Sequence, residues 1–220
     1  MATDEMARDM QRQHDEALAE HIAPLRAELA TLSPQTLAAR SGVVYDAVTR
    51  QLGLDVFGRP FVVRYPEFLV CEAESGAAAD VRRQALVLYY LKIATGAPVA
   101  GRWISFRELR DGMNYHQAFQ GYSGNVLLRA LDGNLARFKA AAARLGAAPQ
   151  PIADAAYAVW ALPRVPLAVV FWQGEDEFPA RIQVLFDASA SDYLPAAGLA
   201  GLGSELCAML RQADQERRGP

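Results

Sequence analysis

The sequence predicts an α+β fold in which an antiparallel sheet is covered by helices. Apolar residues recur at helical spacing at the start of the chain, from about Asp4 to Leu29. Three segments of strand type come late in the chain, and their short connections suit antiparallel neighbours. With 220 residues, of which 52% are hydrophobic, the chain can bury roughly 70% of the surface that its unfolded form exposes, enough for one substantial core.

Two helices are predicted at the N-terminus. The first carries apolar side chains three and four residues apart, namely Met6, Met10, Leu18, Ile22, Leu25 and Leu29. Pro24 is expected to bend or break it, because proline cannot donate to the helical hydrogen-bond ladder. Ser33 is typical of an N-cap and Gly42 of a C-terminal stop, so Pro34–Ser41 is predicted to be a second, short helix.

The next part of the chain alternates in the manner of strands. Leu52, Leu54 and Val56 alternate with Gly53 and Asp55, which predicts the first strand of a hairpin. The turn falls at residues 58–60, the second strand at residues 61–65, and a short extended piece at residues 68–71. Helical spacing returns at residues 79–95 and ends at Gly96.

The second half combines an irregular stretch with a meander. Residues 101–124 look irregular, and residues 126–131 and 135–145 look helical. The three late strands are predicted at residues 154–162, 167–172 and 180–186, and the middle one should lie mid-sheet because it has no polar position. A terminal helix at residues 199–211 precedes a polar tail at residues 212–220, and helices 79–95, 126–145 and 199–211 are expected to cover the sheet.

No linker or internal repeat divides the body of the chain. We therefore predict an N-terminal helical extension over residues 1–32 and a single α+β domain over residues 33–220.

The composition excludes several classes of partner. The chain has 22 basic and 25 acidic residues and a net charge of -3, so no positive field attracts nucleic acid. Its most apolar windows, Ala85–Leu91 and Leu167–Trp172, are far shorter than the ~20 residues of a membrane span. No secretory signal pattern opens the sequence. Cys71 and Cys207 show no disulfide or zinc-site spacing, so a cytoplasmic location is expected.

Several ordered blocks of the sequence resemble one family, catalogued as domain of unknown function 3786. The blocks are Trp103–Leu109, Tyr115 with Ala118, Phe119 and Gly121, Phe171–Gly174, Glu177–Pro179, and Leu185–Pro195. The resemblance extends from about Ser33 to Leu210. It implies no established activity, but it implies a relation to proteins of anaerobic bacteria and archaea, some of which add an iron-sulfur segment like that of corrinoid iron-sulfur proteins.

An iron-sulfur cluster held by this chain is excluded by ligand count. Such clusters need about four thiolates, and the chain has Cys71 and Cys207 only. Any link to corrinoid or one-carbon metabolism therefore follows from the resemblance alone.

The irregular stretch 101–124 mixes aromatic and basic residues in a way that suits a flat, anionic ligand. The aromatic and basic residues of this stretch are Arg102, Trp103, Phe106, Arg107, Arg110, Tyr115, His116, Phe119 and Tyr122. The alternative, which the usual packing of aromatic residues favours, is that Trp103, Phe106 and Phe119 pin the segment to the core while the arginines are solvated. The candidate ligand-binding residues are Trp103, Arg107, Tyr115, His116, Tyr122, Arg164 and Asp187.

Acidic and histidine groups elsewhere predict no metal site. Asp187 to Asp192 supplies oxygens at alternate positions, but Asp192 and Gly198 stand where a calcium loop needs glycine and glutamate. Capping of the strand end and turn by Asp187, Ser189 and Asp192 is favoured, although Asp187 stays the best candidate for the rim of a pocket. Glu175–Glu177 is expected to be a solvated hairpin tip, and Met10 with His14 part of an ordinary helical stripe.

Three functions remain open on the sequence. The first is a cofactor- or small-ligand-binding accessory protein, with the cofactor unidentified. The second is an enzyme acting on a small anionic substrate, in which His116 and Asp187 exchange protons and Arg107 or Arg164 holds the substrate. The third is a subunit that binds a protein partner or a second copy through the N-terminal helix. Catalytic residues cannot be assigned.

Overall fold

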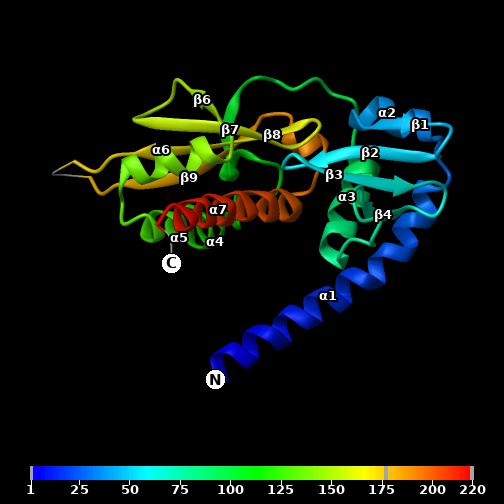
Figure 1. Cartoon of the computed structure of the whole chain (residues 1–220), viewed down its shortest axis with the longest axis horizontal. Helices are drawn as coiled ribbons and strands as arrows, with labels where there is room; N and C mark the ends of the chain where they lie inside the picture. Colours follow the sequence, from blue (N-terminus) through cyan, green and yellow to red (C-terminus); the bar gives the residue numbers. More distant parts are fainter. Residues whose placement is uncertain (1, 176–177, 219–220) are drawn as a thin grey trace. The chain divides into compact units, whose positions relative to one another are not determined.

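The computed structural model describes residues 2–175 and 178–218. The chain forms two compact units, one ending at Ala97 and the other beginning at Pro98, and each unit has its own antiparallel sheet (Figure 1). The predicted α+β class is confirmed. The predicted division into an extension over residues 1–32 and a domain over residues 33–220 stays a prediction.

The first unit combines three helices with a four-stranded meander of strand order β1-β2-β3-β4. Its elements are α1 (Ala2–Leu29), α2 (Pro34–Ser41), β1 (Val44–Asp46), β2 (Gln51–Val56), β3 (Arg59–Arg64), β4 (Leu69–Glu72) and α3 (Val81–Ile93). The predicted early hairpin is confirmed as β2 and β3. The added strand β1 has three residues, with Val44 and Asp46 exposed, so its sequence shows no alternation that could have predicted it.

Both ends of α2 follow the predicted capping rules. The hydroxyl of Ser33 accepts a hydrogen bond from the amide of Thr36 at 3.1 Å. Gly42 lies in the left-handed region at φ 75° and donates its amide to the carbonyl of Ala38. These bonds satisfy backbone groups that a helix end otherwise leaves without partners.

The first helix continues without interruption through Pro24, so the predicted break does not occur. Pro24 is exposed, whereas Ile22 and Leu25 on either side of it are buried. Packing of these neighbours holds the turn in which proline removes a backbone hydrogen bond. The side chains of Met6, Met10 and His14 lie outside the described part of the chain.

The helix predicted at residues 79–95 does not pack where we expected it. As α3 it lies in the first unit, where it contacts α1, α2 and β4. Its buried residues include Val87, Leu88 and Leu91, and the hydroxyl of Tyr90 donates to the carbonyl of Ser41. The expectation that it covers the late strands was wrong, because an apolar helical face does not specify which sheet it will bury.

The second unit carries a five-stranded sheet of order β5-β9-β8-β7-β6. Its elements are β5 (Trp103–Ser105), the 3-10 helix η1 (Phe106–Glu108), α4 (His116–Tyr122), α5 (Gly124–Ala130), α6 (Leu135–Arg144), β6 (Ala148–Gln150), β7 (Ala155–Leu162), β8 (Val165–Trp172), β9 (Arg181–Asp187), the 3-10 helix η2 (Ala190–Asp192) and α7 (Ala196–Arg218).

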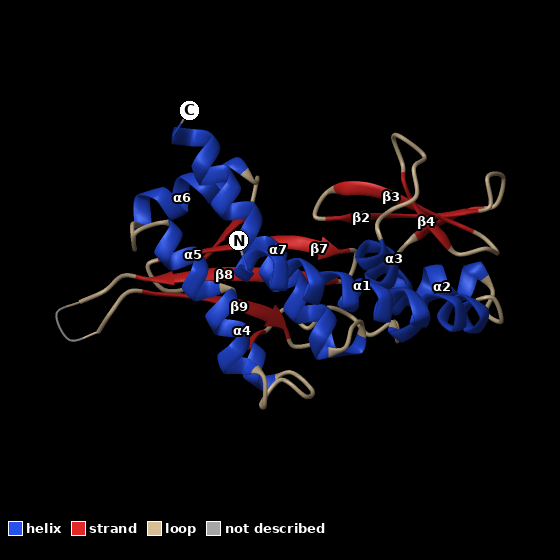
Figure 2. Ribbon diagram, turned by 90° about the horizontal axis from the view of Figure 1, so that it is seen from below, coloured by secondary structure: helices blue, strands red, loops and turns tan. Residues whose placement is uncertain are grey.

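The predicted meander is confirmed as β7, β8 and β9, with β8 in the middle and buried from Val165 to Phe171. Phe138 of α6 contacts Phe171, and Phe119 of α4 contacts Phe186. Leu167 of β8 pairs with Phe186 and Phe171 pairs with Ile182, so these side chains share one face of the sheet. Helices of this unit cover that face (Figure 2).

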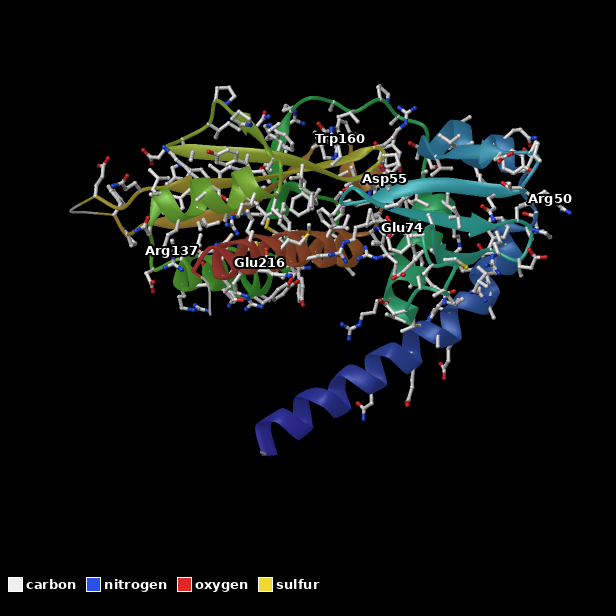
Figure 3. All side chains as sticks on the ribbon, in the orientation of Figure 1. Arg50, Asp55, Glu74, Arg137, Trp160 and Glu216 are labelled. Atoms are coloured by element: carbon white, nitrogen blue, oxygen red, sulfur yellow. The ribbon has the colours of Figure 1, made fainter. Side chains whose placement is uncertain are left out.

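Two parts of the second unit differ from the sequence predictions. The stretch 101–124 contains β5, η1 and α4 instead of being irregular throughout. The predicted polar tail is helical as far as Arg218, because α7 continues past Arg211. An internal ion pair supports this extension. Buried Arg137 of α6, labelled in Figure 3, binds both carboxylate oxygens of buried Asp214, at 3.0 and 2.5 Å.

Glycine at position 203 lets α7 approach the aromatic core of the second unit. A Cβ atom there would lie 2.6 Å from Cζ of Phe119, whereas a Cβ atom on exposed Gly201 would meet nothing within 4 Å.

Gly203→Ala is therefore expected to lower the free energy of unfolding by about 1–3 kcal/mol through overpacking. Gly201→Ala, the matched control in the same helix, should raise it by about 0.5–1 kcal/mol, because alanine is the better helix former. Urea denaturation of both variants measures the difference. Equal shifts in the two variants would contradict the close packing of α7 on Phe119.

Candidate functional site

The candidate residues all belong to the second unit, and they fall into two groups. One group surrounds η1 and α4 and consists of Arg107, Tyr115, His116 and Tyr122. The other lies at one end of the five-stranded sheet and consists of Trp103, Arg164 and Asp187.

Three buried phenylalanines form the base of the first group. The rings of Phe106 and Phe119 are stacked with their centroids 4.4 Å apart, and Phe186 of β9 lies 5.8 Å from each. Phe106 and Phe119 thus pin the chain to the core, as the packing alternative predicted. Aromatic rings at such distances attract one another, and this attraction stabilises the packing in addition to the hydrophobic effect of burying their surface.

Two tyrosines lie on the outer side of this aromatic base. Tyr115, Phe119 and Tyr122 are four and three residues apart, so they neighbour one another on α4. The rings of Tyr115 and Tyr122 lie 6.1 Å apart, and Tyr122 meets Phe119 edge-on at 5.7 Å. Tyr115 remains 49% exposed and Tyr122 38% exposed. Exposed Arg107 follows Phe106, whose ring lies 6.4 Å from that of Tyr115, and its Nε contacts Met113, two residues before Tyr115. We call Tyr115, Tyr122 and this neighbouring Arg107 the tyrosine surface.

The tyrosines of this surface interact with each other. Burial and a hydrogen bond with Tyr115 both raise the pKa of Tyr122 above its ordinary value. Because tyrosine is already neutral at neutral pH, a higher pKa keeps Tyr122 uncharged. The surface therefore carries aromatic rings and hydroxyl groups, and its formal positive charge comes from Arg107.

A tight loop connects η1 to α4 and places Arg107 and His116. The loop turns at Asp111, whose φ is 64°, and at Gly112. A Cβ atom on Gly112 would lie 1.9 Å from the carbonyl oxygen of Phe106, so only glycine fits there. Nε of exposed Arg107 donates to Sδ of Met113 at 3.2 Å, and Nδ1 of His116 donates to the carbonyl of the same methionine at 2.6 Å.

At the end of the sheet, Asp187 is almost fully buried and hydrogen-bonded within the protein. Its carboxylate accepts from the amides of Ala100 and Gly101 at 2.9 and 2.8 Å. It also accepts from the amide and hydroxyl of Ser189 at 2.9 and 2.6 Å. Burial alone would raise the pKa of Asp187, but these hydrogen bonds together lower it below the ordinary value.

Asp187 therefore caps the turn after β9, as the capping alternative predicted, and in addition it holds the segment before β5. The bonds to Ala100 and Gly101 could not have been predicted, because those residues are 87 and 86 positions away.

Arg164 and Trp103 lie near the same strand end. Trp103 pairs with Asp187 across β5 and β9. Arg164 occupies the turn between β7 and β8 and hydrogen-bonds with fully buried Tyr193. Burial raises the pKa of Tyr193, and the charge of Arg164 partly opposes that shift. These contacts are internal, so the group is well suited to hold the sheet end together.

Among the described residues, no three histidine, cysteine, aspartate or glutamate side chains are grouped so that they could hold a metal ion. Asp176 and Glu177 of the predicted hairpin tip lie outside the described part. None of the helices that the structure describes combines the length and apolar character that crossing a bilayer demands. Both cysteines are buried free thiols, and burial raises the pKa of Cys207 to about 12.

Sequence reasoning missed Met113, Phe186 and Tyr193 as parts of these groups, whereas it did place Ser189 in the turn with Asp187. For α4, the spacing of Tyr115, Phe119 and Tyr122 was a helical signal that the surrounding Gly, Asn and Ser obscured. For Phe186 and Tyr193 no local signal exists, because their partners come from distant parts of the sequence.

Comparison with known proteins gives a family and no activity. The family described as domain of unknown function (DUF3786) matches residues 33–209. No curated protein and no solved structure matches the chain.

Removal of the Asp187 charge should change how stability depends on pH. The folded pKa is lowered, so the contribution of the carboxylate is present above its unfolded pKa and is lost as pH falls through the folded pKa. Asp187→Asn is expected to lower the free energy of unfolding at pH 7 by about 2–3 kcal/mol, and its deficit relative to the natural chain should shrink below about pH 4.

Chemical denaturation at several pH values measures this effect. Asp55→Asn, which alters an exposed carboxylate on β2 (Figure 3), serves as the control and should change stability by less than about 0.5 kcal/mol. A deficit for Asp187→Asn that stays constant down to pH 2.5 would argue against the lowered pKa.

Proposed function

Because the chain belongs to the DUF3786 family, whose description assigns no activity, we propose a function from the geometry: the second unit binds a planar, negatively charged small molecule on the tyrosine surface. The protein then acts as an accessory or carrier protein for that ligand. The observation that carries this proposal is the pair of half-exposed rings, Tyr115 and Tyr122, held 6.1 Å apart over a buried aromatic base.

Rigidity of the two rings supports the proposal. The ring centroids of Tyr115 and Phe106 lie 6.4 Å apart, and those of Tyr122 and Phe119 lie 5.7 Å apart. Both phenylalanines are buried. Rings already held in place lose little conformational freedom when a ligand stacks on them. Tyrosine also combines a large apolar face with a hydroxyl that can hydrogen-bond, which suits a ligand that is flat and polar at its edge.

The charge of the surface indicates the class of ligand. Arg107 is exposed and its guanidinium presents a planar set of donors that matches carboxylate or phosphate groups. His116 uses Nδ1 on the carbonyl of Met113, so in the neutral ring Nε2 remains an acceptor. An aromatic or conjugated ring system with a carboxylate or phosphate group fits these three features together.

The enzyme alternative has less physical support. It needs Asp187 to exchange a proton with His116, but a buried carboxylate with a lowered pKa and four internal hydrogen bonds is a weak base.

The interaction alternative rests on α1, whose first half extends beyond α3 (Figure 1). Its buried residues Ile22, Leu25 and Leu29 belong to the helix that packs on α3, so they are already covered within the first unit. The side chains of Met6 and Met10, which the sequence adds to the same stripe, lie outside the described part of the chain.

Binding of four probes tests the proposed ligand class: a corrinoid, a haem, a flavin mononucleotide and an adenine nucleotide. The corrinoid is included because the family resemblance implies a relation to proteins that carry a segment like that of corrinoid iron-sulfur proteins. Isothermal titration calorimetry should detect at least one probe. Tyr115→Leu and Tyr122→Leu should each weaken its binding by about tenfold, because each removes one stacking face.

Two further variants make this test specific. Arg107→Gln should weaken the binding of anionic probes by about fivefold and leave the binding of an uncharged analogue unchanged. Trp160→Leu alters a 57% exposed aromatic residue on β7 (Figure 3) and should leave binding unchanged. Failure of all four probes to bind, or equal losses in Trp160→Leu and Tyr122→Leu, would refute the proposal.

A further inference from the structure

Met113 is an exposed methionine that contacts Arg107, the basic member of the tyrosine surface. Its side chain is 52% exposed, and its thioether sulfur accepts a hydrogen bond from Nε of Arg107 at 3.2 Å. The other methionine whose side chain the structure describes, Met209 of α7, is half-buried. Thioether sulfur is a weak acceptor, so this contact holds the Arg107 guanidinium without strongly competing with an anion.

The backbone around Met113 keeps it in this position. Its carbonyl accepts from Nδ1 of His116 at 2.6 Å. The amide of Tyr115 donates to the carbonyl of Gly112 at 3.2 Å, and the amide of Gly112 donates to the carbonyl of Leu109 at 3.0 Å. Met113 is thus an exposed side chain on a loop with a defined path, and its sulfur faces the cation of the proposed binding surface.

Oxidation of this sulfur would change the strength of the contact. A peroxide transfers one oxygen atom to the thioether: its O–O bond breaks, an S–O bond forms, and water leaves when the peroxide is hydrogen peroxide. The sulfur loses two electrons and the peroxide gains them. The product, methionine sulfoxide, is polar and is reduced again by sulfoxide reductases with a thiol as the electron source. Its oxygen is a far better acceptor for the Arg107 N–H group than sulfur is.

We propose that Met113 is a site of reversible oxidation that controls the tyrosine surface: its sulfoxide binds the Arg107 guanidinium and so weakens the pairing of Arg107 with an anionic ligand. This inference rests on the proposed function for its effect on binding. The oxidation and the Met113–Arg107 contact are independent of that function.

The first measurement follows the chemistry without any ligand. Under limiting hydrogen peroxide, peptide mass spectrometry should find sulfoxide at Met113 at least about fivefold faster than at Met209, because reactivity follows exposure. In the ¹⁵N–¹H spectrum, the Nε–H signal of Arg107, identified by its loss in Arg107→Gln, should move on oxidation. Equal rates at the two methionines, or an unmoved Arg107 signal, would overturn the proposal.

The second measurement follows binding of an anionic probe from the panel above. Oxidation should weaken binding by about fivefold, the order expected for one exposed ion pair, and treatment with a sulfoxide reductase should restore it. Met113→Leu should bind the probe equally before and after peroxide treatment. A loss of binding that persists in oxidised Met113→Leu would overturn the role of Met113.

The two measurements separate the inference from the proposed function. If the Arg107 signal moves on oxidation but the reduced protein binds no probe, the proposed function fails while the oxidation site and its contact stand. If the reduced and oxidised proteins bind an anionic probe equally, the proposed function stands and control by Met113 fails.

Discussion

The stack of Phe106 on Phe119, with Phe186 against both rings, is the contact on which the candidate site depends. It joins η1 and α4, which are close in the sequence, to β9, which follows about sixty residues later. Because Gly203 has no side chain, α7 can pack closely against the rings of Phe119 and Phe186. Because Gly112 has none, the loop before α4 can pack closely against the carbonyl of Phe106. Because this base is rigid, the tyrosines above it have fixed positions although they are partly exposed.

Buried charges hold the rest of the second unit together in a related way. The Asp187 carboxylate receives its hydrogen bonds from two separate segments, and Arg137 binds Asp214 and the carbonyl of Ala130 from inside the helical layer. A buried charge is tolerated only when such partners replace the lost water. The ion pair of Arg137 with Asp214 also explains why α7 remains helical through residues whose composition resembles a solvated tail.

These internal contacts distinguish the two groups of candidate residues. At the sheet end, the carboxylate of Asp187 is occupied by four donors and the guanidinium of Arg164 is engaged with Tyr193. Around α4, the tyrosine rings and Arg107 keep exposed surface, and the contact of Arg107 is with a weakly accepting sulfur. Polar groups that already satisfy one another contribute stability, whereas exposed and rigid groups retain the capacity to bind.

The sequence alone determined the features that depend on neighbouring residues. Capping by Ser33 and Gly42, the hairpin of β2 and β3, and the meander centred on β8 all follow from patterns that span a few positions. Only the tertiary structure decided the three-residue strands, the passage of α1 through Pro24 and the division of the candidate residues. These features depend on contacts between residues distant in sequence, whose pairing no local pattern encodes.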